Sequence, residues 1–301
     1  MKKDGLGRVV AAHGRHDLVL MPDGSLLNCV TRGRKGDVAC GDYVAATRTG
    51  DRSGVIDSVE PRSALFMRSD GFKSKVLASN VDQVWGIVAG APPFSDELVS
   101  RAAIEAARQS LPVTLILNKS DLSDATAIAR ARLAPFAALG YQVAEVSVKS
   151  DGEGVRATLL PKLAGHTTLF FGESGMGKSS LLNLLVPNAN ARTRDISAAL
   201  NSGRHTTTDA RLYDLESGDG VIIDTPGFQE FGLNHLTPGQ IERAFPELAP
   251  YLGHCKFYNC THLVEPGCAV REAVARGAVS ASRYALFSEL TRASLRAASV
   301  T

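Results

Sequence analysis

The sequence predicts a multidomain protein with three parts: a β-barrel at the N-terminus, a central α/β domain built on a parallel sheet, and a mainly helical C-terminal domain. Three observations predict this fold class. Short apolar runs separated by turn residues fill the first 66 positions, strand-like and helix-like segments then alternate, and a cluster of cysteines precedes a final helical segment. The predicted domain boundaries are residues 1–66, 67–232 and 233–301.

The composition is that of an ordinary folded protein. Of the 301 residues, 44% are hydrophobic and 21% are charged, which excludes a wholly disordered chain. No apolar run approaches the roughly 18 residues that a membrane-spanning helix needs. The first residues, Met1-Lys2-Lys3-Asp4, lack the apolar core of a signal peptide. We therefore expect a cytoplasmic protein that makes no membrane contact.

The first 66 residues predict a small all-β barrel, because turn signals such as Pro22-Asp23-Gly24 separate five short apolar runs. The runs are residues 7–12, 17–21, 26–30, 41–46 and 54–59. Residues 1–75 contain 13 basic against 9 acidic residues, a balance of +4, whereas the remainder has 20 against 22, a balance of −2. This excess fits nucleic-acid contact, but on charge alone a solvated face is the simpler explanation.

Alternating strands and helices in the central part predict βαβ units and a parallel sheet. The expected strands are residues 81–89, 113–118, 142–148 and 167–171. The expected helices are residues 95–109, with Ser95 as the N-cap, and 125–139. A polar loop is expected at 190–202.

In the C-terminal domain, Thr237-Pro238 indicates the start of a helix. A second helix is expected from Ser280 to about Ala298. Its apolar residues at helical spacing are Ala285, Leu286, Leu290 and Leu295.

The segment from Gly172 to Ser179, GESGMGKS, fits the phosphate-binding pattern G-x-x-x-x-G-K-[ST]. It lies between a predicted strand and a predicted helix at 179–185, which is the setting that this loop requires. Backbone N–H groups would surround phosphate oxygens, Lys178 would reach the β- and γ-phosphates, and Ser179 would bind Mg²⁺. The expected phosphate-binding residues are Gly172, Glu173, Ser174, Gly175, Met176, Gly177, Lys178, Ser179 and Ser180.

Asn118-Lys119-Ser120-Asp121 ends a predicted buried strand and carries the N-K-x-D pattern by which GTPases recognise guanine. The Asp121 carboxylate would accept hydrogen bonds from guanine N1 and N2, a pair of donors that adenine lacks. Asn118 would contact the ring edge, and Lys119 would lie along the base. Ser147 follows the next strand and is expected to support the base, with a plain turn as the alternative.

A further nucleotide motif, Asp224-Thr225-Pro226-Gly227, follows the apolar segment 221–223. A GTPase uses D-x-x-G to hold the Mg²⁺ shell through the aspartate and to contact the γ-phosphate through the glycine, here Gly227. Residues 203–208 lie between the two phosphate motifs, and a threonine there would complete the Mg²⁺ shell. Three consecutive threonines leave the choice open, with Thr207 preferred.

The order of these motifs is unusual, because the base motif precedes the phosphate loop, whereas ordinary GTPases place it last. A circular permutation of the sheet accounts for this order, since permutation preserves which strands are neighbours when the old termini lie close together. The D-x-x-G segment then leads directly into the C-terminal domain. We expect the nucleotide state to be able to move that domain.

Cys255, Cys260, His262 and Cys268 offer three thiolates and one imidazole, a set suited to a closed tetrahedral Zn²⁺ site. Four protein ligands leave no open position, so one structural zinc ion per chain is expected. The alternative is a group of buried cysteines near a surface histidine. The two other cysteines, at positions 29 and 40, are expected to be small core residues.

Together these motifs resemble those of the RsgA (YjeQ) family of circularly permuted GTPases, which act on the small ribosomal subunit. The matching segments are residues 118–121, 172–180, 203–208, 224–228 and the cysteine cluster with 265–268. The resemblance spans nearly the whole chain. It implies an OB-fold for the barrel and a role in late maturation and quality control of the 30S subunit. It also implies GTP hydrolysis that the subunit stimulates and that is coupled to release.

Phe228 occupies the position where Ras-like GTPases carry the glutamine that orients the attacking water. An apolar side chain cannot do this, and Gln229 is expected to face away, so slow intrinsic hydrolysis is predicted. The resemblance points to His205 as the residue that orients water once the ribosome orders its loop. The alternative is a loop histidine that contacts rRNA or nothing.

The family resemblance directs the basic residues of the barrel toward 16S rRNA. The candidates are Arg8, Arg15, Arg32, Arg34 and Lys35, of which Arg32, Arg34 and Lys35 in one loop are preferred. The expected partners are the 30S subunit, 16S rRNA, GTP and GDP, and the chain is expected to be a monomer. The alternatives are a permuted GTPase acting elsewhere and a nucleotide-dependent RNA-binding switch with little turnover. An ATPase is disfavoured, because it has no use for N-K-x-D.

Overall fold

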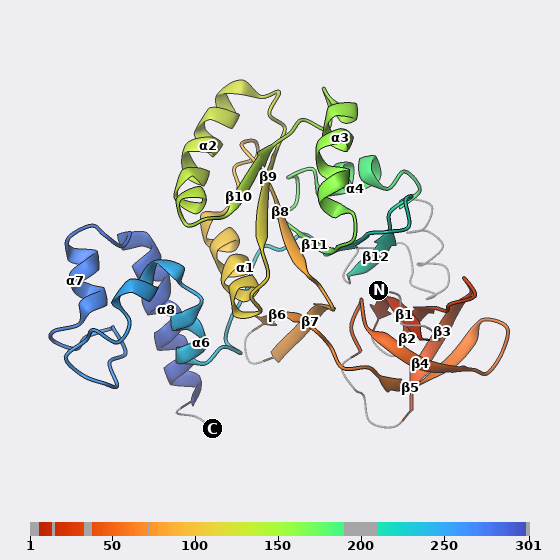
Figure 1. Cartoon of the computed structure of the whole chain (residues 1–301), viewed down its shortest axis with the longest axis horizontal. Coiled ribbons are helices and arrows are strands. Elements are labelled where there is room, and N and C mark those ends of the chain that lie inside the picture. The colour runs from red at the N-terminus through yellow and green to blue at the C-terminus, as the bar shows by residue number, and fades with distance from the viewer. Residues whose placement is uncertain (1–5, 14–15, 33–37, 71–72, 190–209, 299–301) are drawn as a thin grey trace.

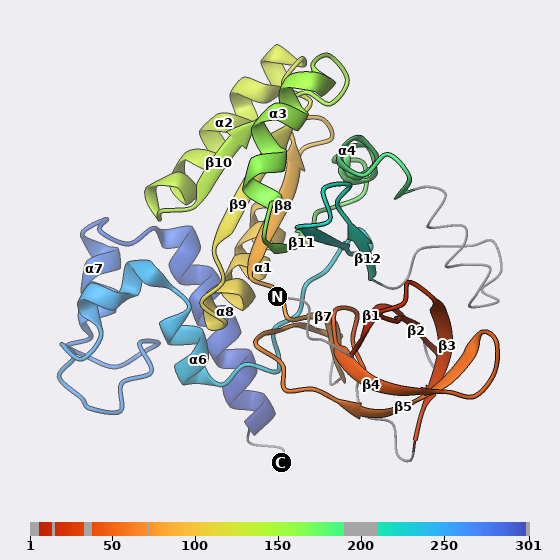
Figure 2. The same ribbon diagram turned by 45° about the vertical axis from the view of Figure 1, so that its right-hand side comes forward.

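The computed structural model describes residues 6–13, 16–32, 38–70, 73–189 and 210–298. Three bodies lie side by side in Figure 1, with the barrel on the right, the α/β domain in the centre and the C-terminal helices on the left. The view in Figure 2 keeps this arrangement. The predicted fold class is therefore confirmed. Residues 190–202, expected to form a loop, lie outside the described residues.

The N-terminal strands close into a barrel, because they follow the order β1-β2-β3-β5-β4 and β4 pairs back with β1. The strands are β1 (Gly7–His13), β2 (His16–Leu20), β3 (Leu26–Thr31), β4 (Tyr43–Arg48) and β5 (Ser53–Val59). Cys29 lies in the barrel core and Cys40 is also buried, as expected. The fourth strand begins later than predicted, because Asp42 turns inward and binds Arg62 through both carboxylate oxygens.

A two-stranded hairpin that the sequence did not predict links the barrel to the α/β domain. It consists of β6 (Leu65–Asp70) and β7 (Lys73–Ser79), which pair antiparallel. In Figure 1 it lies below the central sheet, and β6 packs against helix α1 (Asp96–Arg108). Phe66 and Ala78 bury their side chains completely, so the hairpin belongs to the core.

The central sheet has the order β10-β9-β8-β11-β13-β12, and all its pairings are parallel except that of β12 with β13. The strands are β8 (Gln83–Ala89), β9 (Val113–Asn118), β10 (Gln142–Glu145), β11 (Thr167–Phe171), β12 (Arg211–Asp214) and β13 (Val221–Asp224). Helices α1 and α2 (Ser123–Ala138) lie on one side of it, and α3 (Gly152–Leu163) and α4 (Lys178–Leu185) on the other. The expected strand at 142–148 is shorter, and α3 and β12 were not predicted.

The barrel is joined to the α/β domain by backbone pairing. Strand β1 pairs antiparallel with β12, through Ala11 and Arg211, so eleven strands form one continuous sheet. Arg8 donates to the Thr167 hydroxyl at 3.0 Å, and its guanidinium lies over the ring of Tyr43. Arg8 therefore stabilises this joint, and its contact with rRNA stays a prediction.

The C-terminal region is helical, as predicted. It contains α6 (Pro238–Arg243), the 3₁₀ segment η1 (Pro246–Tyr251), α7 (Ala269–Ala275) and α8 (Ala281–Ala298). Thr237 caps α6 and exchanges hydrogen bonds with Gln240 in a capping box.

The buried face of α8 differs from the expected one. Leu286 and Leu290 are buried, but Ala285 is exposed and Leu295 is 39% exposed. Phe287 is instead fully buried and packs edge-on against Phe245. No helix among the described residues is long and apolar enough to cross a membrane.

Candidate nucleotide site and metal centre

The phosphate loop connects β11 to α4 and faces an open cavity with a volume of about 510 Å³. The cavity is lined by Lys119, Glu173, Ser174, Gly175, Gly177, Lys178, Ser179, Ser180, Pro226 and Gly227. Gly177 caps α4 with φ of +90°, and a Cβ there would lie 2.2 Å from Asn118 Nδ2. A glycine is therefore required where the base motif meets the phosphate loop.

Asn118 braces the base loop against the phosphate loop. Its side chain is buried, with Nδ2 donating to the Met176 carbonyl at 3.1 Å and Oδ1 accepting from the Val148 N–H at 3.3 Å. Lys119 has φ of +63° and donates to the Ala91 carbonyl at 2.8 Å, at the edge of the cavity. These contacts hold the base motif beside the cavity.

Asp121 and Ser147 meet at the same edge of the sheet. The Ser147 hydroxyl donates to Asp121 Oδ1 at 2.5 Å. This hydrogen bond lowers the pKa of the Asp121 carboxyl, which is exposed. The carboxylate therefore stays ionised at neutral pH and keeps acceptor positions for a ligand with paired N–H donors.

Lys178 and Asp224 form a buried ion pair between the phosphate loop and the end of β13. Lys178 Nζ lies 2.7 Å from Asp224 Oδ1 and also donates to the Thr225 carbonyl. Burial raises the pKa of Asp224, while the neighbouring Lys178 opposes this shift. The Thr225 hydroxyl donates to the Phe170 carbonyl at 2.7 Å, which fixes the start of the D-x-x-G segment against β11.

The Glu173 carboxylate accepts the Ser95 N–H at 2.6 Å, so its side chain caps α1 and only its backbone is left to bind phosphate. Ser95 is the N-cap of α1, as predicted. Phe228 is buried, Gln229 is exposed, and neither is among the residues that line the cavity. That neither residue positions water stays a prediction. Arg32 is largely exposed and lies 3.6 Å from Asp57. His205, Thr207, Arg34 and Lys35 lie outside the described residues.

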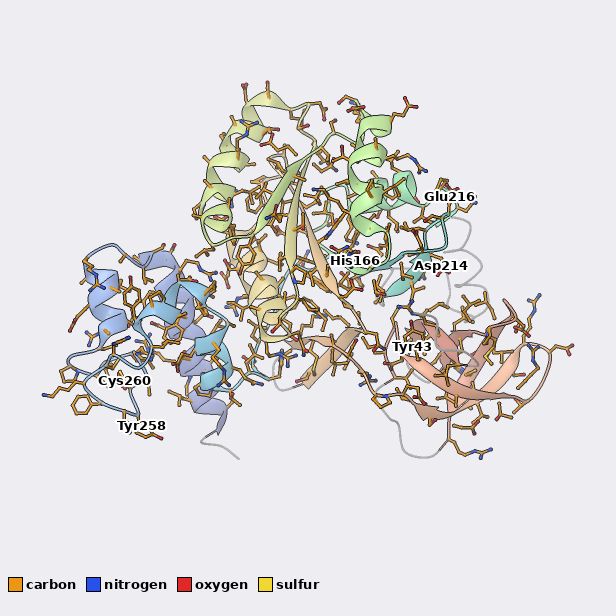
Figure 3. All side chains as sticks on the ribbon, viewed as in Figure 1. Tyr43, His166, Asp214, Glu216, Tyr258 and Cys260 are labelled. Atoms are coloured by element: carbon orange, nitrogen blue, oxygen red, sulfur yellow. The ribbon has the colours of Figure 1, made fainter. Side chains whose placement is uncertain are left out.

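The ligand atoms of Cys255, Cys260, His262 and Cys268 lie within 4.8 Å of one another, and Figure 3 places Cys260 on a loop of the C-terminal body beside Tyr258. Cys255 Sγ is 3.8 Å from Cys268 Sγ, and His262 Nδ1 is 3.4 and 3.3 Å from these two sulfurs. A tetrahedral site with Zn–S bonds of about 2.3 Å places its sulfurs about 3.8 Å apart. The donor set therefore fits zinc in both chemistry and size.

The surroundings of the cluster support metal binding. Glu242 Oε1 lies 3.7 Å from His262 Nε2, the ring nitrogen that faces away from the cysteines. Tyr284 donates to the His262 carbonyl at 2.7 Å. Burial raises the pKa of the Cys260 thiol to about 12, and a bound cation would oppose this shift by stabilising the thiolate.

The carboxylate of Glu265 organises the loop between His262 and Cys268. Its oxygens accept from the Thr261 hydroxyl and from the N–H groups of Thr261, Leu263 and Val264. Although burial opposes the change, these bonds lower the pKa of Glu265 to about 2.

Fold and site together define a circularly permuted P-loop GTPase: the phosphate loop, D-x-x-G and N-K-x-D all end parallel strands at one edge, in permuted chain order. The RsgA GTPase family model matches residues 59–234, and the chain belongs to this family. A small ribosomal subunit biogenesis GTPase RsgA of Burkholderia pseudomallei is 56% identical, over 94% of this chain and 90% of its own length. Its counterpart in Paraburkholderia phytofirmans is 53% identical over 94% and 92%.

Solved structures agree with this assignment. YjeQ from Thermotoga maritima superposes with a TM-score of 0.69 at 30% identity, covering 96% of this chain and 98% of its own. YloQ, described as a circularly permuted GTPase, gives 0.65 at 25% identity over 97% and 95%. The expected family and the permuted GTPase fold are thus confirmed.

Proposed function

We propose that this GTPase acts in late maturation and quality control of the 30S ribosomal subunit, which stimulates its hydrolysis of GTP and from which hydrolysis releases it. The observation that carries the proposal is the meeting of Asn118, Lys178, Asp121 and Asp224 at one sheet edge, in a chain 56% identical to a small-subunit biogenesis GTPase. The domain boundaries that we propose are 1–66, 67–232 and 233–301.

We assign GTP recognition to the residues around the cavity. The backbone of 172–180 and the Gly227 N–H would bind the phosphates, with Lys178 neutralising the β- and γ-phosphates. Asp121, held by Ser147, would accept from guanine N1 and N2. Mg²⁺ would be bound by Ser179, Asp224 and Thr207, and it would neutralise charge that develops on the phosphate oxygens.

For the catalytic step we assign His205 to orient the attacking water, because Phe228 is apolar and buried and Gln229 is not among the residues that line the cavity. Water attacks the γ-phosphorus, the bond between the γ-phosphorus and the β–γ bridging oxygen breaks, and the products are GDP and phosphate. Replacing His205 with alanine should strongly lower hydrolysis in the presence of 30S subunits and leave GTP affinity unchanged.

The remaining contacts complete the proposal. Cys255, Cys260, His262 and Cys268 would bind one structural Zn²⁺. The loop with Arg32, Arg34 and Lys35 would contact 16S rRNA phosphates. The protein would act as a cytoplasmic monomer.

The alternative is a nucleotide-dependent RNA-binding switch with little turnover. Sedimentation with 30S subunits separates the two. We expect co-sedimentation with a non-hydrolysable GTP analogue, and release when GTP replaces the analogue. If GTP and the analogue hold the protein on the subunit equally and persistently, the alternative is correct.

A further inference from the structure

A buried polar joint connects three elements outside the nucleotide cavity: helix α1, strand β6 and the segment that follows the D-x-x-G motif. At its centre is Glu105 of α1, which is completely buried. Its Oε1 accepts from the Met67 N–H at 3.0 Å, and Arg108 binds both carboxylate oxygens at 2.6 and 2.9 Å. The pair is neutral overall, and it leaves Oε2 with room for one more donor.

His235 supplies that donor. Its Nε2 lies 3.1 Å from Glu105 Oε2, and its Nδ1 lies 2.7 Å from the Ser69 hydroxyl of β6. One tautomer satisfies both contacts: Nε2–H donates to the carboxylate, and Nδ1 accepts from the serine. The Ser69 oxygen in turn accepts the His235 backbone N–H at 3.2 Å. The imidazole therefore fastens its own segment to α1 and to β6 at once.

The segment between Gly227 and His235 lies along β6. The Ser69 N–H donates to the Gly232 carbonyl at 2.8 Å, and a Cβ on Gly232 would lie 2.2 Å from the Ser69 carbonyl oxygen. Phe231 packs edge-on against both Phe66 and Phe228. The backbone after the D-x-x-G loop is therefore held against the β6–β7 hairpin. The contacts of His235 are the last of these attachments along the chain.

Helix α1 is itself fastened to the nucleotide loop. Its N-cap Ser95 donates to Glu173 of the phosphate loop at 2.6 Å, and Glu105 lies in its last turns. Near its middle, Arg101 pairs with Glu289 of α8 at 2.7 Å. Figures 1 and 2 show α1 between the sheet and the C-terminal helices. One helix thus contacts the phosphate loop, the D-x-x-G exit and the C-terminal domain.

We propose that His235 is a positioning residue for GTP hydrolysis, because its bond to Glu105 fixes the exit of the D-x-x-G segment to helix α1 and so sets how Gly227 meets the γ-phosphate. The inference rests on the proposed function, since it concerns the rate that the subunit stimulates. His235 does not touch the nucleotide cavity, whose lining residues lie in the phosphate loop, the base motif and 226–227.

Two conservative variants separate the two bonds of the imidazole. Glutamine places an N–H near the position of Nε2, so His235→Gln keeps a donor for Glu105 and loses the acceptor for Ser69. Asparagine places its amide near the position of Nδ1, so His235→Asn keeps contact with Ser69 and loses Glu105. Ser294→Ala is the matched control, because the Ser294 hydroxyl is buried and donates to the Leu236 carbonyl of the same segment at 2.7 Å rather than to Glu105 or Ser69.

The experiment measures GTP turnover as a function of 30S concentration for the four proteins, together with GTP affinity and thermal unfolding. We expect His235→Asn to lower the stimulated kcat about tenfold, the effect of one lost hydrogen bond to a charged group. GTP affinity and the 30S concentration at half-maximal rate should stay within about twofold. His235→Gln and Ser294→Ala should retain most of the rate.

Equal loss of rate in His235→Asn, His235→Gln and Ser294→Ala, or no loss in any of them, would overturn the inference and leave the proposed function intact. The inference would also be overturned if the rate loss in His235→Asn came only from lower thermal stability. In that case Ser294→Ala, when destabilised to the same extent, would lose the same fraction of its rate. If the unsubstituted protein shows no stimulation, the proposed function fails and the inference fails with it.

Discussion

Lys178 Nζ lies 2.7 Å from Asp224 Oδ1, so that the lysine of the phosphate loop and the aspartate of D-x-x-G form one buried ion pair. The two side chains are 9% and 10% exposed. Their pairing couples the two phosphate motifs directly. Substituting one or both partners should therefore change the free energy of unfolding and the binding of GTP in different ways.

Replacing Lys178 with alanine leaves a buried carboxylate without its partner. We expect the free energy of unfolding to fall by about 3 kcal/mol and GTP binding to be lost. Adding Asp224→Asn removes the uncompensated charge, so the double variant should recover stability and still fail to bind GTP. Urea unfolding and fluorescent-nucleotide titration measure the two properties. A double variant as unstable as Lys178→Ala would show that the pair is not the source of the loss.

We expect Asp121 to determine the specificity of the site for guanine. Asp121→Asn removes the charged acceptor for the two guanine donors, and two lost hydrogen bonds to a charged group predict a GTP affinity at least about 100-fold weaker. Xanthine carries a carbonyl in place of the guanine amino group, so the asparagine amide should restore binding to XTP. Competition titrations with GTP, XTP and ATP test this, with Asp124→Asn on α2 as a control that should bind GTP normally. An unchanged preference for GTP in Asp121→Asn would contradict the assignment.

The pKa of Glu265, lowered from 4.5 to about 2, predicts a pH dependence of stability. Because the folded state holds the carboxylate at a lower pKa, this group stabilises the protein fully above about pH 4.5 and progressively less as the pH falls toward 2. Glu265→Gln should therefore lower the melting temperature near pH 7, and its difference from the unsubstituted protein should shrink below about pH 4.5. Melting curves from pH 7 to pH 3 measure this. Glu272→Gln, at an exposed position, should show no such trend. A constant difference across the range would rule out this role for Glu265.

The metal centre should stabilise the C-terminal domain and leave the nucleotide site intact. We expect about one equivalent of zinc in the purified protein and much less in Cys260→Ser. Loss of zinc should expose residues 233–301 to protease while GTP affinity stays within about twofold. Cys29→Ala, which changes a cysteine of the barrel core, should keep its zinc. A folded, protease-resistant C-terminal domain without metal would contradict the structural role.

The sequence predicted the parts of the fold that carry a local signal. The motifs at 118–121, 172–179 and 224–227 follow apolar strands, and the structure brings all three to one edge of the sheet. Ser95 was identified as an N-cap because a capping serine before acidic residues is a short-range pattern. The permuted order followed from the order of the motifs along the chain.

Other parts carry no such signal. Helix α3 contains Gly152, Gly154 and Pro161, which conceal its periodicity, and β12 has only four residues and needs β13 and β1 to form. The contact of Glu105 with His235 joins positions 130 residues apart, and nothing in either neighbourhood indicates it. From the sequence alone, an isolated glutamate on a helix is expected to be solvated. Only the tertiary structure shows that Met67, Arg108 and His235 donate hydrogen bonds to it.

The most direct test of the central claim is GTP turnover by the purified protein alone, with 30S subunits, and with 50S subunits. We predict slow turnover by the protein alone, because the apolar and buried Phe228 cannot orient water, together with strong stimulation by 30S subunits and none by 50S subunits. GTP binding without stimulation by 30S would contradict the ribosomal function and leave a permuted GTPase that acts elsewhere.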